Sequence, residues 1–344
     1  MLAVLFTFLA TNHLEAQEIH FSQYYASPLT LNHALTGKFD GLWRVNAIYR
    51  DQYRNAVSNN PLPYMTPSFS VDFSLLKNKL KTDALGVGAM VFYDKVGGLN
   101  TLKAGLSLAY LKGLDKNNRY HLALGLQGVY GNRQINGDYL FEEDILSGNT
   151  GIPGVDDLNL ANQKAVNSVD MTAGALFDAK FTDWMTFYAG YSFFNVLRHK
   201  DDFITAKDNQ TPFRHVAHGG FEFEIKKRWL ILPGALYQTT VKTKEINFGS
   251  TFGYKLLTKK EKTAKIFLGA WYRWDVAVIA KAGFDFENFR LSGAYDIGTG
   301  AFGKDLKNDT GARMPNAFEI AVSYIGPYKN KSVTTNTYLF NPRF

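Results

Sequence analysis

Residues 20–54 read HFSQYYASPLTLNHALTGKFDGLWRVNAIYRDQYR, and their pattern changes halfway. The first half follows neither a helical nor a strand period, because aromatic residues, a Ser27-Pro28 break and small polar clusters interrupt one another. The second half alternates strictly: Trp43, Val45, Ala47 and Tyr49 share one side, and Arg44, Asn46 and Arg50 share the other. A period of two is typical of a strand with one apolar face and one wet face. The stretch therefore predicts an irregular opening segment that leads into the first strand of a sheet.

The composition narrows the class of protein. The 344 residues have a mean hydropathy of -0.19 and no run of about 18 apolar residues, which excludes a helical membrane protein. Cysteine is absent, so disulfides, thiolate metal sites and cysteine nucleophiles are excluded. Aromatic residues reach 15% and glycine occurs 30 times. These two features fit a membrane barrel with aromatic girdles, and they also fit a soluble all-β protein.

The net charge of +7 does not indicate nucleic-acid binding. A nucleic-acid surface gathers its basic residues into one patch. Here the basic residues are divided among short connectors, at Lys77/Lys79/Lys81, Lys112/Lys116, Lys226/Lys227/Arg228 and Lys255/Lys259/Lys260/Lys262. We interpret these clusters as solvated turns, and no nucleic-acid partner is expected.

Alternating segments recur along the whole chain after the first strand. They are expected from Trp43 to Arg50 and over 65–75, 84–93, 102–110, 120–130, 168–180, 184–193, 215–225, 229–239, 244–254, 265–274, 276–285, 289–297 and 318–325. This makes about 14 strands, and closed bacterial barrels have an even number. The predicted fold is all-β: a transmembrane antiparallel outer-membrane β-barrel.

The lengths of the connections support a membrane barrel over a soluble sandwich. The short, mostly basic connectors all fall on one side if strands alternate in direction: 77–83, 112–118, 180–183, 226–228, 256–263 and 286–288. The long polar loops fall on the other side: 55–64, 131–167, 194–214 and 298–317. Outer-membrane barrels have short periplasmic turns and long external loops. The pattern therefore predicts an outer-membrane location, with outer-membrane lipid against the barrel wall.

The two ends of the chain are expected to lie outside the barrel wall. Residues 1–16 resemble the apolar core and cleavage site of a signal peptide, although the basic n-region is missing, which suggests a misassigned start or a clipped record. Residues 17–38 are expected to form a periplasmic N-terminal segment, 39–325 the barrel, and 326–344 a periplasmic C-terminal tail. The sequence leaves open whether the lumen is open or plugged.

The opening stretch resembles the PorP/SprF family of type IX secretion and gliding-motility outer-membrane proteins of Bacteroidetes. That family begins with a phrase close to HFSQ and two aromatic residues, then a proline and N-P-A-x-x-G, and its first strand ends with Y-R-x-Q. The matching positions are Phe21, Ser22, Gln23, Pro28, Asn32, Ala34, Gly37, Tyr49, Arg50 and Gln52. His33 stands where the family has proline. Weaker matches are Ser70 and Asp72, Tyr295-Asp296, and the closing Pro342-Arg343-Phe344, where Asn341 replaces a common cysteine.

The resemblance implies a function that composition and spacing do not. Relatives support the secretion or surface retention of large adhesins that carry a C-terminal sorting domain, some of which drive gliding. The implied partners are therefore an exported adhesin or other large surface protein and other type IX secretion components. Loops 131–167 and 194–214 are expected to hold the exported protein, while the N-terminal segment and the tail act at the periplasmic side.

The charged residues of the strands are interpreted as lumen residues, because charges on the lipid face are costly. The candidates are Arg44, Arg50, Glu222, Glu224 and Lys281, with Glu222 and Glu224 expected to pair with basic partners such as Arg44, Arg50 or Lys281. Glu222 and Glu224 share a strand face and could instead form a catalytic dyad. His215 and His218 are three apart and point to opposite faces of a strand, so no metal site is expected, and no cofactor motif occurs.

Three functions remain open, in this order. The first is the binding and anchoring barrel that the family resemblance implies. The second is a passive porin or uptake channel, which ion conductance of the purified barrel would favour. The third is an outer-membrane enzyme, which is not expected because no catalytic motif is present.

Overall fold

The computed structural model describes residues 19–52, 64–77, 80, 82–96, 99–135, 165–199, 210–241, 243–259, 262–299 and 316–327. Within these ranges no helix combines the length and the apolar character that a membrane crossing requires. The predicted signal peptide and nearly all of the C-terminal tail lie outside the described residues.

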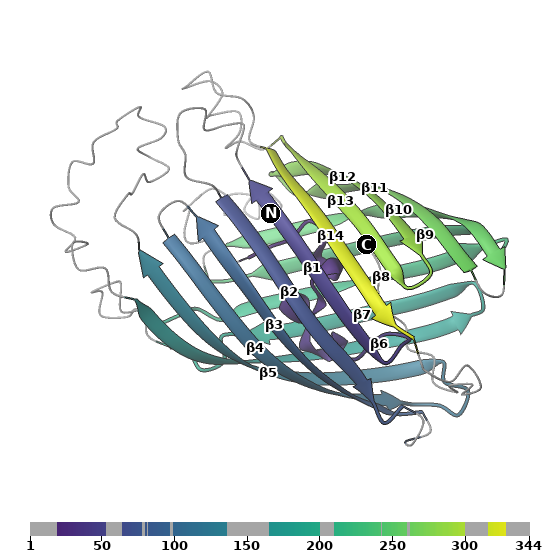
Figure 1. The fold of residues 1–344 in the computed structure, drawn as a ribbon, viewed down its shortest axis with the longest axis horizontal. Helices are drawn as coiled ribbons and strands as arrows, with labels where there is room; N and C mark the ends of the chain where they lie inside the picture. Colours follow the sequence, from purple (N-terminus) through teal and green to yellow (C-terminus); the bar gives the residue numbers. More distant parts are fainter. Residues whose placement is uncertain are drawn as a thin grey trace, which may run out of the picture.

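Fourteen strands make up almost all of the described structure. Their bounds are β1 Trp43–Gln52, β2 Tyr64–Leu75, β3 Ala84–Val96, β4 Leu99–Gly113, β5 Tyr120–Ile135, β6 Val166–Thr182, β7 Met185–Phe194, β8 Arg214–Ile225, β9 Trp229–Thr239, β10 Lys244–Lys259, β11 Lys262–Arg273, β12 Ala277–Phe286, β13 Phe289–Gly298 and β14 Asn316–Gly326. Each strand pairs antiparallel with its neighbours in sequence, and β1 pairs with β14 (Figure 1). The structure therefore confirms the predicted closed 14-strand antiparallel barrel.

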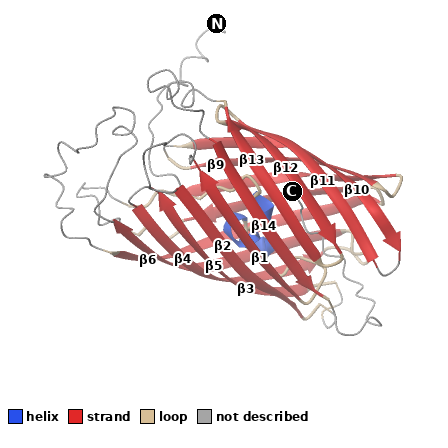
Figure 2. Ribbon diagram, turned by 45° about the horizontal axis from the view of Figure 1, so that its top comes forward, coloured by secondary structure: helices blue, strands red, loops and turns tan. Residues whose placement is uncertain are grey.

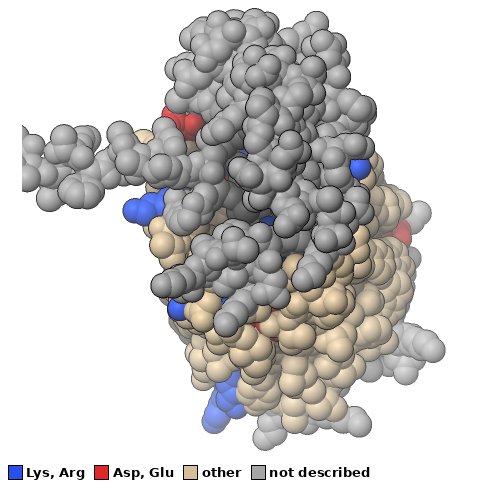
Figure 3. All heavy atoms as spheres, turned by 90° about the vertical axis from the view of Figure 1, so that its left-hand side faces the viewer, with Lys and Arg blue, Asp and Glu red and all other residues tan. Residues whose placement is uncertain are grey.

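Along each strand, apolar side chains that face the lipid alternate with polar or small side chains that face the lumen. On β4, Leu106 and Leu108 point outward and are exposed, whereas Ser107 between them is only 6% exposed. The same pattern on every strand makes the outer wall apolar. Figure 3 shows that charged side chains are sparse on the described surface of one face. A wall of this kind is stable only against hydrocarbon, because a surface this apolar would otherwise associate in water.

Tryptophan lies where the wall meets the headgroup region, with one exception. Trp184, Trp229 and Trp274 are exposed at or beside strand ends, as expected of an aromatic girdle. Trp271 instead faces the lumen and is 2% exposed. Its indole N–H donates to Thr251 Oγ1 at 3.0 Å, so the polar end of the ring is satisfied inside the barrel.

The strand order sorts the connections onto two rims. Residues 76–83, 114–119, 183–184, 226–228, 260–261 and 287–288 join strands at one rim, which we call the periplasmic rim. The opposite rim, called the outer rim, receives 53–63, 97–98, 136–165, 195–213, 240–243, 274–276 and 299–315. The predicted sorting of short and long connections is confirmed. The expected connector 256–263 is mostly strand, since β10 and β11 extend toward each other with a register shift between Lys255 and Leu257.

The lumen contains the irregular opening segment. Residues 20–39, called the lumenal segment below, form three short helical turns inside the ring of strands (Figure 2). Almost every residue of the segment is buried. The segment was expected to lie in the periplasm, and the structure places it in the lumen instead. The physical reason is that its polar groups and backbone find partners on the wet inner faces of the strands.

Candidate functional site

The lumenal segment bends at residues suited to each bend. It comprises η1 Tyr24–Ala26, α1 Pro28–Leu31 and η2 His33–Leu35. Pro28 is the first residue of α1, where no N–H is needed. The Asn32 side chain accepts a hydrogen bond from the Ala34 N–H at 2.9 Å and caps η2. Gly37 has φ of 69°, a conformation that only glycine adopts without strain.

One end of the segment is held by the carboxylate of Glu319 on β14. The backbone N–H groups of Ser22 and Gln23 donate to its two oxygens at 2.6 and 2.8 Å. Arg50 of β1 forms an ion pair with the same carboxylate. One buried carboxylate thus binds two consecutive peptide N–H groups and a guanidinium, so its charge is compensated away from water.

The Ser22 hydroxyl joins the first strand to two late ones, β11 and β13. It donates to Asp296 on β13 at 2.7 Å. It accepts from Arg50 on β1 at 2.9 Å and from Arg273 on β11 at 2.8 Å. Both arginines also contact the carboxylate of Asp296, each at 3.1 Å. A single serine therefore uses its full hydrogen-bonding capacity inside a buried charge network.

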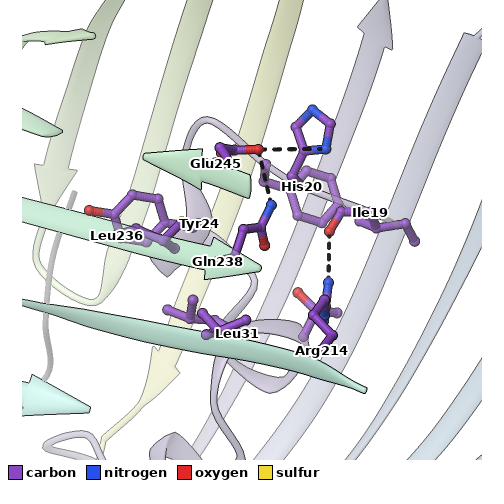
Figure 4. A pocket seen from close by; sticks show the side chains of 11 residues that line it. Ile19, His20, Tyr24, Leu31, Arg214, Leu236, Gln238 and Glu245 are labelled. Carbon is purple, nitrogen blue, oxygen red and sulfur yellow. Dashed lines mark hydrogen bonds and ion pairs between the residues drawn. The ribbon is translucent and has the colours of Figure 1, made fainter. Parts of the chain in front are cut away.

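The first described residues of the segment lie beside a small cavity, shown in Figure 4. The carbonyl of Ile19 accepts from Arg214 of β8 at 3.3 Å. His20 lies 4.0 Å from Glu245 of β10, which also accepts a hydrogen bond from Gln238 at 3.0 Å. The cavity has a volume of about 20 Å³. This is the scale of a single water molecule, so the mouth of the lumen is closely packed here.

The middle of the segment contacts β6, β7 and β8. Asn32 Nδ2 donates to the carbonyl of Ala175 at 3.0 Å and lies 3.0 Å from His218 Nε2. The other ring nitrogen of His218 is 2.9 Å from the hydroxyl of Tyr25. His218 therefore bridges two turns of the segment. Because the Asn32 amide nitrogen can only donate, His218 Nε2 accepts from it, and the Nδ1–H group is left to donate to the Tyr25 hydroxyl.

Glycines on the inner wall allow the segment to approach the strands closely. A Cβ added to Gly86, Gly125 or Gly174 would overlap Thr36, His33 or Asn32, respectively. These glycines lie on β3, β5 and β6, at positions whose side chains would point into the lumen. The glycines that alternate with apolar residues in these strands thus mark close contact with the lumenal segment, through its backbone at Gly86 and Gly125 and through the Asn32 side chain at Gly174.

The other end of the segment is anchored by two aspartates. Asp72 of β2 accepts from the Gly37 N–H at 2.8 Å and pairs with Arg44 at 2.8 Å. Arg44 in turn donates to the carbonyl of Leu35 at 3.0 Å. Asp178 of β6 forms a buried ion pair with Lys38. Each end of the segment therefore has a carboxylate that binds it and a basic residue that neutralises that carboxylate.

The segment runs through the lumen in a defined direction. Arg50, Asp296 and Glu319 lie near the ends of their strands at the outer rim. Asp72 and Asp178 lie near the strand ends at the periplasmic rim. The chain therefore passes from the outer rim at residue 19 to the periplasmic rim at about residue 40, where it turns back into β1. This direction is the reverse of a segment that enters from the periplasm.

The residues expected in the lumen are there, but with different partners. Arg44 and Arg50 are buried and pair with Asp72, Asp296 and Glu319.

Lys281 is also buried, and its ammonium lies 4.0 Å from the centre of the Trp271 ring and 5.2 Å from that of Tyr24. Glu222 and Glu224 lie on the inner face of β8, which they share with His218. Glu224 pairs with Lys255 at 2.7 Å rather than with an arginine or with Lys281. Glu224 thus has a basic partner, but it is none of the three residues named from the sequence, because the acidic pair lies near the periplasmic end of β8.

The positions that resemble family motifs fall into two groups. Those buried in the lumen are Phe21, Ser22, Gln23, Pro28, Asn32, Ala34, Gly37 and Arg50. Tyr49 and Gln52 are half-buried near the outer end of β1, and the Tyr49 hydroxyl donates to Asp51 at 3.1 Å. The weaker matches Asp72 and Asp296 prove to be anchors of the segment. The closing residues 341–344 lie outside the described residues.

Sequence reasoning missed several members of the network. These are Lys38, His121, Asp178, His218, Glu245, Arg273 and Glu319. A usable signal existed: the residues of this group that lie on strands occupy lumen-facing positions between outward apolar neighbours, as Arg273 does between Tyr272 and Trp274.

The two histidines of β8 point in opposite directions, as expected. His218 faces the lumenal segment, whereas His215 packs against Tyr191 and Phe193. Among the described residues, no three acidic, histidine or cysteine side chains are placed to hold a metal ion. The arrangement binds a peptide segment through charge and backbone contacts.

An apolar outer wall, a polar lumen and an even number of antiparallel strands define a transmembrane β-barrel of the outer-membrane type. The sequence matches the family of type IX secretion system membrane proteins PorP/SprF over residues 13–324, so the chain belongs to this family and the resemblance is confirmed. No curated protein gives a significant match to the chain.

Solved structures with a similar fold are outer-membrane transport proteins. The Pseudomonas putida toluene transporter TodX aligns over 90% of this chain and 98% of its own, with 12% identity and a TM-score of 0.51. The CymD monoaromatic hydrocarbon channel aligns over 89% of this chain and 94% of its own, with 10% identity and a TM-score of 0.50. At this identity the likeness shows the fold alone. Family and fold together indicate a type IX secretion membrane protein of the outer membrane.

Proposed function

We propose that this protein supports the export and surface anchoring of a partner adhesin with a C-terminal sorting domain, and that it acts as a plugged platform. The observation that carries the proposal is the lumenal segment, which is held at both rims by buried charge networks. Two cavities beside it have volumes of about 20 and 30 Å³. Space on this scale admits one or two water molecules, which favours a scaffold over a conduit.

The proposed contacts follow from the two rims. The adhesin would bind at the outer rim through the connections 131–167 and 194–214, most of which lie outside the described residues. Other type IX secretion components would bind at the periplasmic rim and the tail 326–344. Outer-membrane lipid would cover the apolar wall. In a gliding member of the Bacteroidetes, an adhesin that moves along the surface is the expected partner.

Gene deletion tests the proposal. We expect the cognate adhesin to remain unexported or to be shed into the medium, and whole-cell immunolabelling measures its surface display. Complementation with the unaltered gene should restore the display. Normal display in the deletion strain would contradict the proposal.

A passive channel is the second candidate, since the fold is shared with proteins that are described as channels. Planar-bilayer recording distinguishes the two. We expect the intact barrel to be silent and a barrel lacking residues 20–38 to conduct, because the wall behind the segment is lined by charged residues. Steady conductance of the intact barrel would favour the channel.

A further inference from the structure

The seam between the first and last strands is covered from inside by the start of the lumenal segment. Ile48 of β1 and Ala321 of β14 are register partners across this seam. Phe21 packs against both of them in one buried apolar cluster. The side chain of Phe21 therefore contacts the two strands at the same level of the barrel.

The next lumen-facing pair of the seam, toward the outer rim, is bound by Ser22 and Gln23. Arg50 and Glu319 are also register partners. Glu319 accepts the N–H groups of Ser22 and Gln23, and Arg50 donates to the Ser22 hydroxyl. Successive residues of the segment thus contact successive cross-strand pairs of the seam.

The middle of the segment is attached to strands away from the seam. The turn η2 lies against β4, β5 and β6. Asn32 donates to the carbonyl of Ala175 on β6, and Gly125 on β5 leaves room for the backbone of His33. The segment therefore links strands from the first half of the chain to the final closing pair.

The seam is the one strand pairing in the barrel that joins the two ends of the sequence. Every other pairing joins consecutive strands. Long-range pairings are slow to form, because the entropy of closing the chain is lost before the contacts reward it. A ligand that contacts both partners lowers this barrier by holding them close together.

We propose that Phe21, Ser22 and Gln23 form a closure template: the segment docks on the early strands and captures β14 through Glu319, so that β1 and β14 pair around it. This function in assembly goes beyond the proposed role in adhesin anchoring and does not depend on it. It also explains the direction of the segment, since strands that close around a docked segment leave residue 19 at the outer rim without threading.

Paired cysteines measure seam closure directly, because the chain has no cysteine of its own. Ala47 and Val322 are register partners across the seam, so A47C/V322C reports its closure. Leu108 and Leu126 are register partners on β4 and β5, so L108C/L126C reports an ordinary hairpin. Cross-strand partners lie within the range that a disulfide spans.

The full chain is refolded into detergent micelles, and disulfide formation is followed over time in three backgrounds. These are the unaltered segment, F21A/S22A, and T30A as a matched control, because within the described part of the chain the Thr30 hydroxyl bonds to Ser27 alone. We expect F21A/S22A to slow or reduce the seam disulfide several-fold while the β4–β5 disulfide forms normally, and T30A to change neither.

Two outcomes would overturn the template. Equal loss of both disulfides in F21A/S22A would mean that the segment stabilises the whole barrel without guiding the seam. Unchanged formation of both would mean that the strands close without it. The milder S22A variant, assayed in the same way, keeps the test valid if F21A/S22A does not fold.

Discussion

Arg50 of β1 and Glu319 of β14 are register partners at the seam that closes the barrel, and their side chains form an ion pair inside the lumen. The same carboxylate binds the backbone of Ser22 and Gln23. The pair therefore connects barrel closure with plugging, because a disturbed seam would loosen the segment and a missing segment would leave the carboxylate with two fewer donors.

Glu319→Gln should destabilise the barrel by roughly 3–5 kcal/mol, the usual cost of removing one partner of a buried ion pair. The reason is that Arg50 keeps its charge in a site closed to water, and Asp296 is the one anionic partner left to it among the residues the structure describes. The free energy of unfolding in urea, measured in detergent, gives the value.

Glu222→Gln is the matched control, since Glu222 is a half-buried lumen carboxylate with no ion pair among the described residues. A smaller effect of Glu319→Gln than of Glu222→Gln would show that the seam pair is not a main contact of the barrel.

Gly125→Ala should displace the lumenal segment, because the added methyl group would overlap the carbonyl of His33. Overpacking of this kind costs about 1–3 kcal/mol. Gly128→Ala on the same strand is the control, since nothing lies within 4 Å of its added Cβ. We expect Gly125→Ala to raise bilayer conductance and to lower the midpoint of thermal unfolding, and Gly128→Ala to leave both unchanged. Equal behaviour of the two variants would contradict the close backbone contact.

The strands could be predicted from the sequence because the two faces meet different media. Leu106 faces lipid and is apolar, whereas Ser107 faces the lumen and is polar. This alternation gives each strand a period of two that can be recognised without knowing which strands pair. Closure of the barrel could be predicted from the even number of strands and from the placement of short and long connections on opposite sides. The ends of the strands are harder to predict. The lysines where β10 ends and β11 begins are typical of a turn, although most of them lie in the strands.

The occupied lumen could not be predicted in the same way. Phe21 and Tyr24 are buried in the segment, but no periodicity distinguishes aromatic residues that face a lumen from those in a loop. The choice of partners depends on barrel closure: Arg50 meets Glu319 across 269 positions of sequence, which alternation along one strand does not encode. Asp72 and Asp296 belong to motifs that resemble the family. The motifs do not show that these aspartates bind the lumenal segment, which is visible only in the structure.

The periplasmic rim should weaken in acid through Asp83. This aspartate precedes β3 and accepts hydrogen bonds from Tyr110, Lys112 and the Gly113 N–H at 2.6, 2.9 and 3.0 Å. Burial alone would raise the pKa of Asp83, but these three donors outweigh it and lower the pKa below its ordinary value. The resulting stabilisation is fully present above the pKa of the unfolded chain, about 3.9, and is lost as pH falls through the lower native pKa.

Unfolding in urea at several pH values between neutrality and the acid limit measures this loss. Asp83→Asn should remove its share of the pH dependence while leaving the fold at neutral pH. An unchanged pH profile in that variant would assign the acid sensitivity to other carboxylates.

Lys281→Met should leave the barrel as stable as before or make it more stable. The Lys281 ammonium is buried and has no hydrogen-bond acceptor among the described residues, and its near neighbours are the rings of Trp271 and Tyr24. A desolvated cation costs more than the roughly 0.5–2 kcal/mol that ring contacts return, whereas methionine fills similar space without a charge. Arg50→Met is the contrasting variant: it removes a cation with two carboxylate partners and should be strongly destabilising. Urea unfolding of both variants decides the matter, and a loss for Lys281→Met as large as that for Arg50→Met would show that the lumen uses Lys281 as a charge.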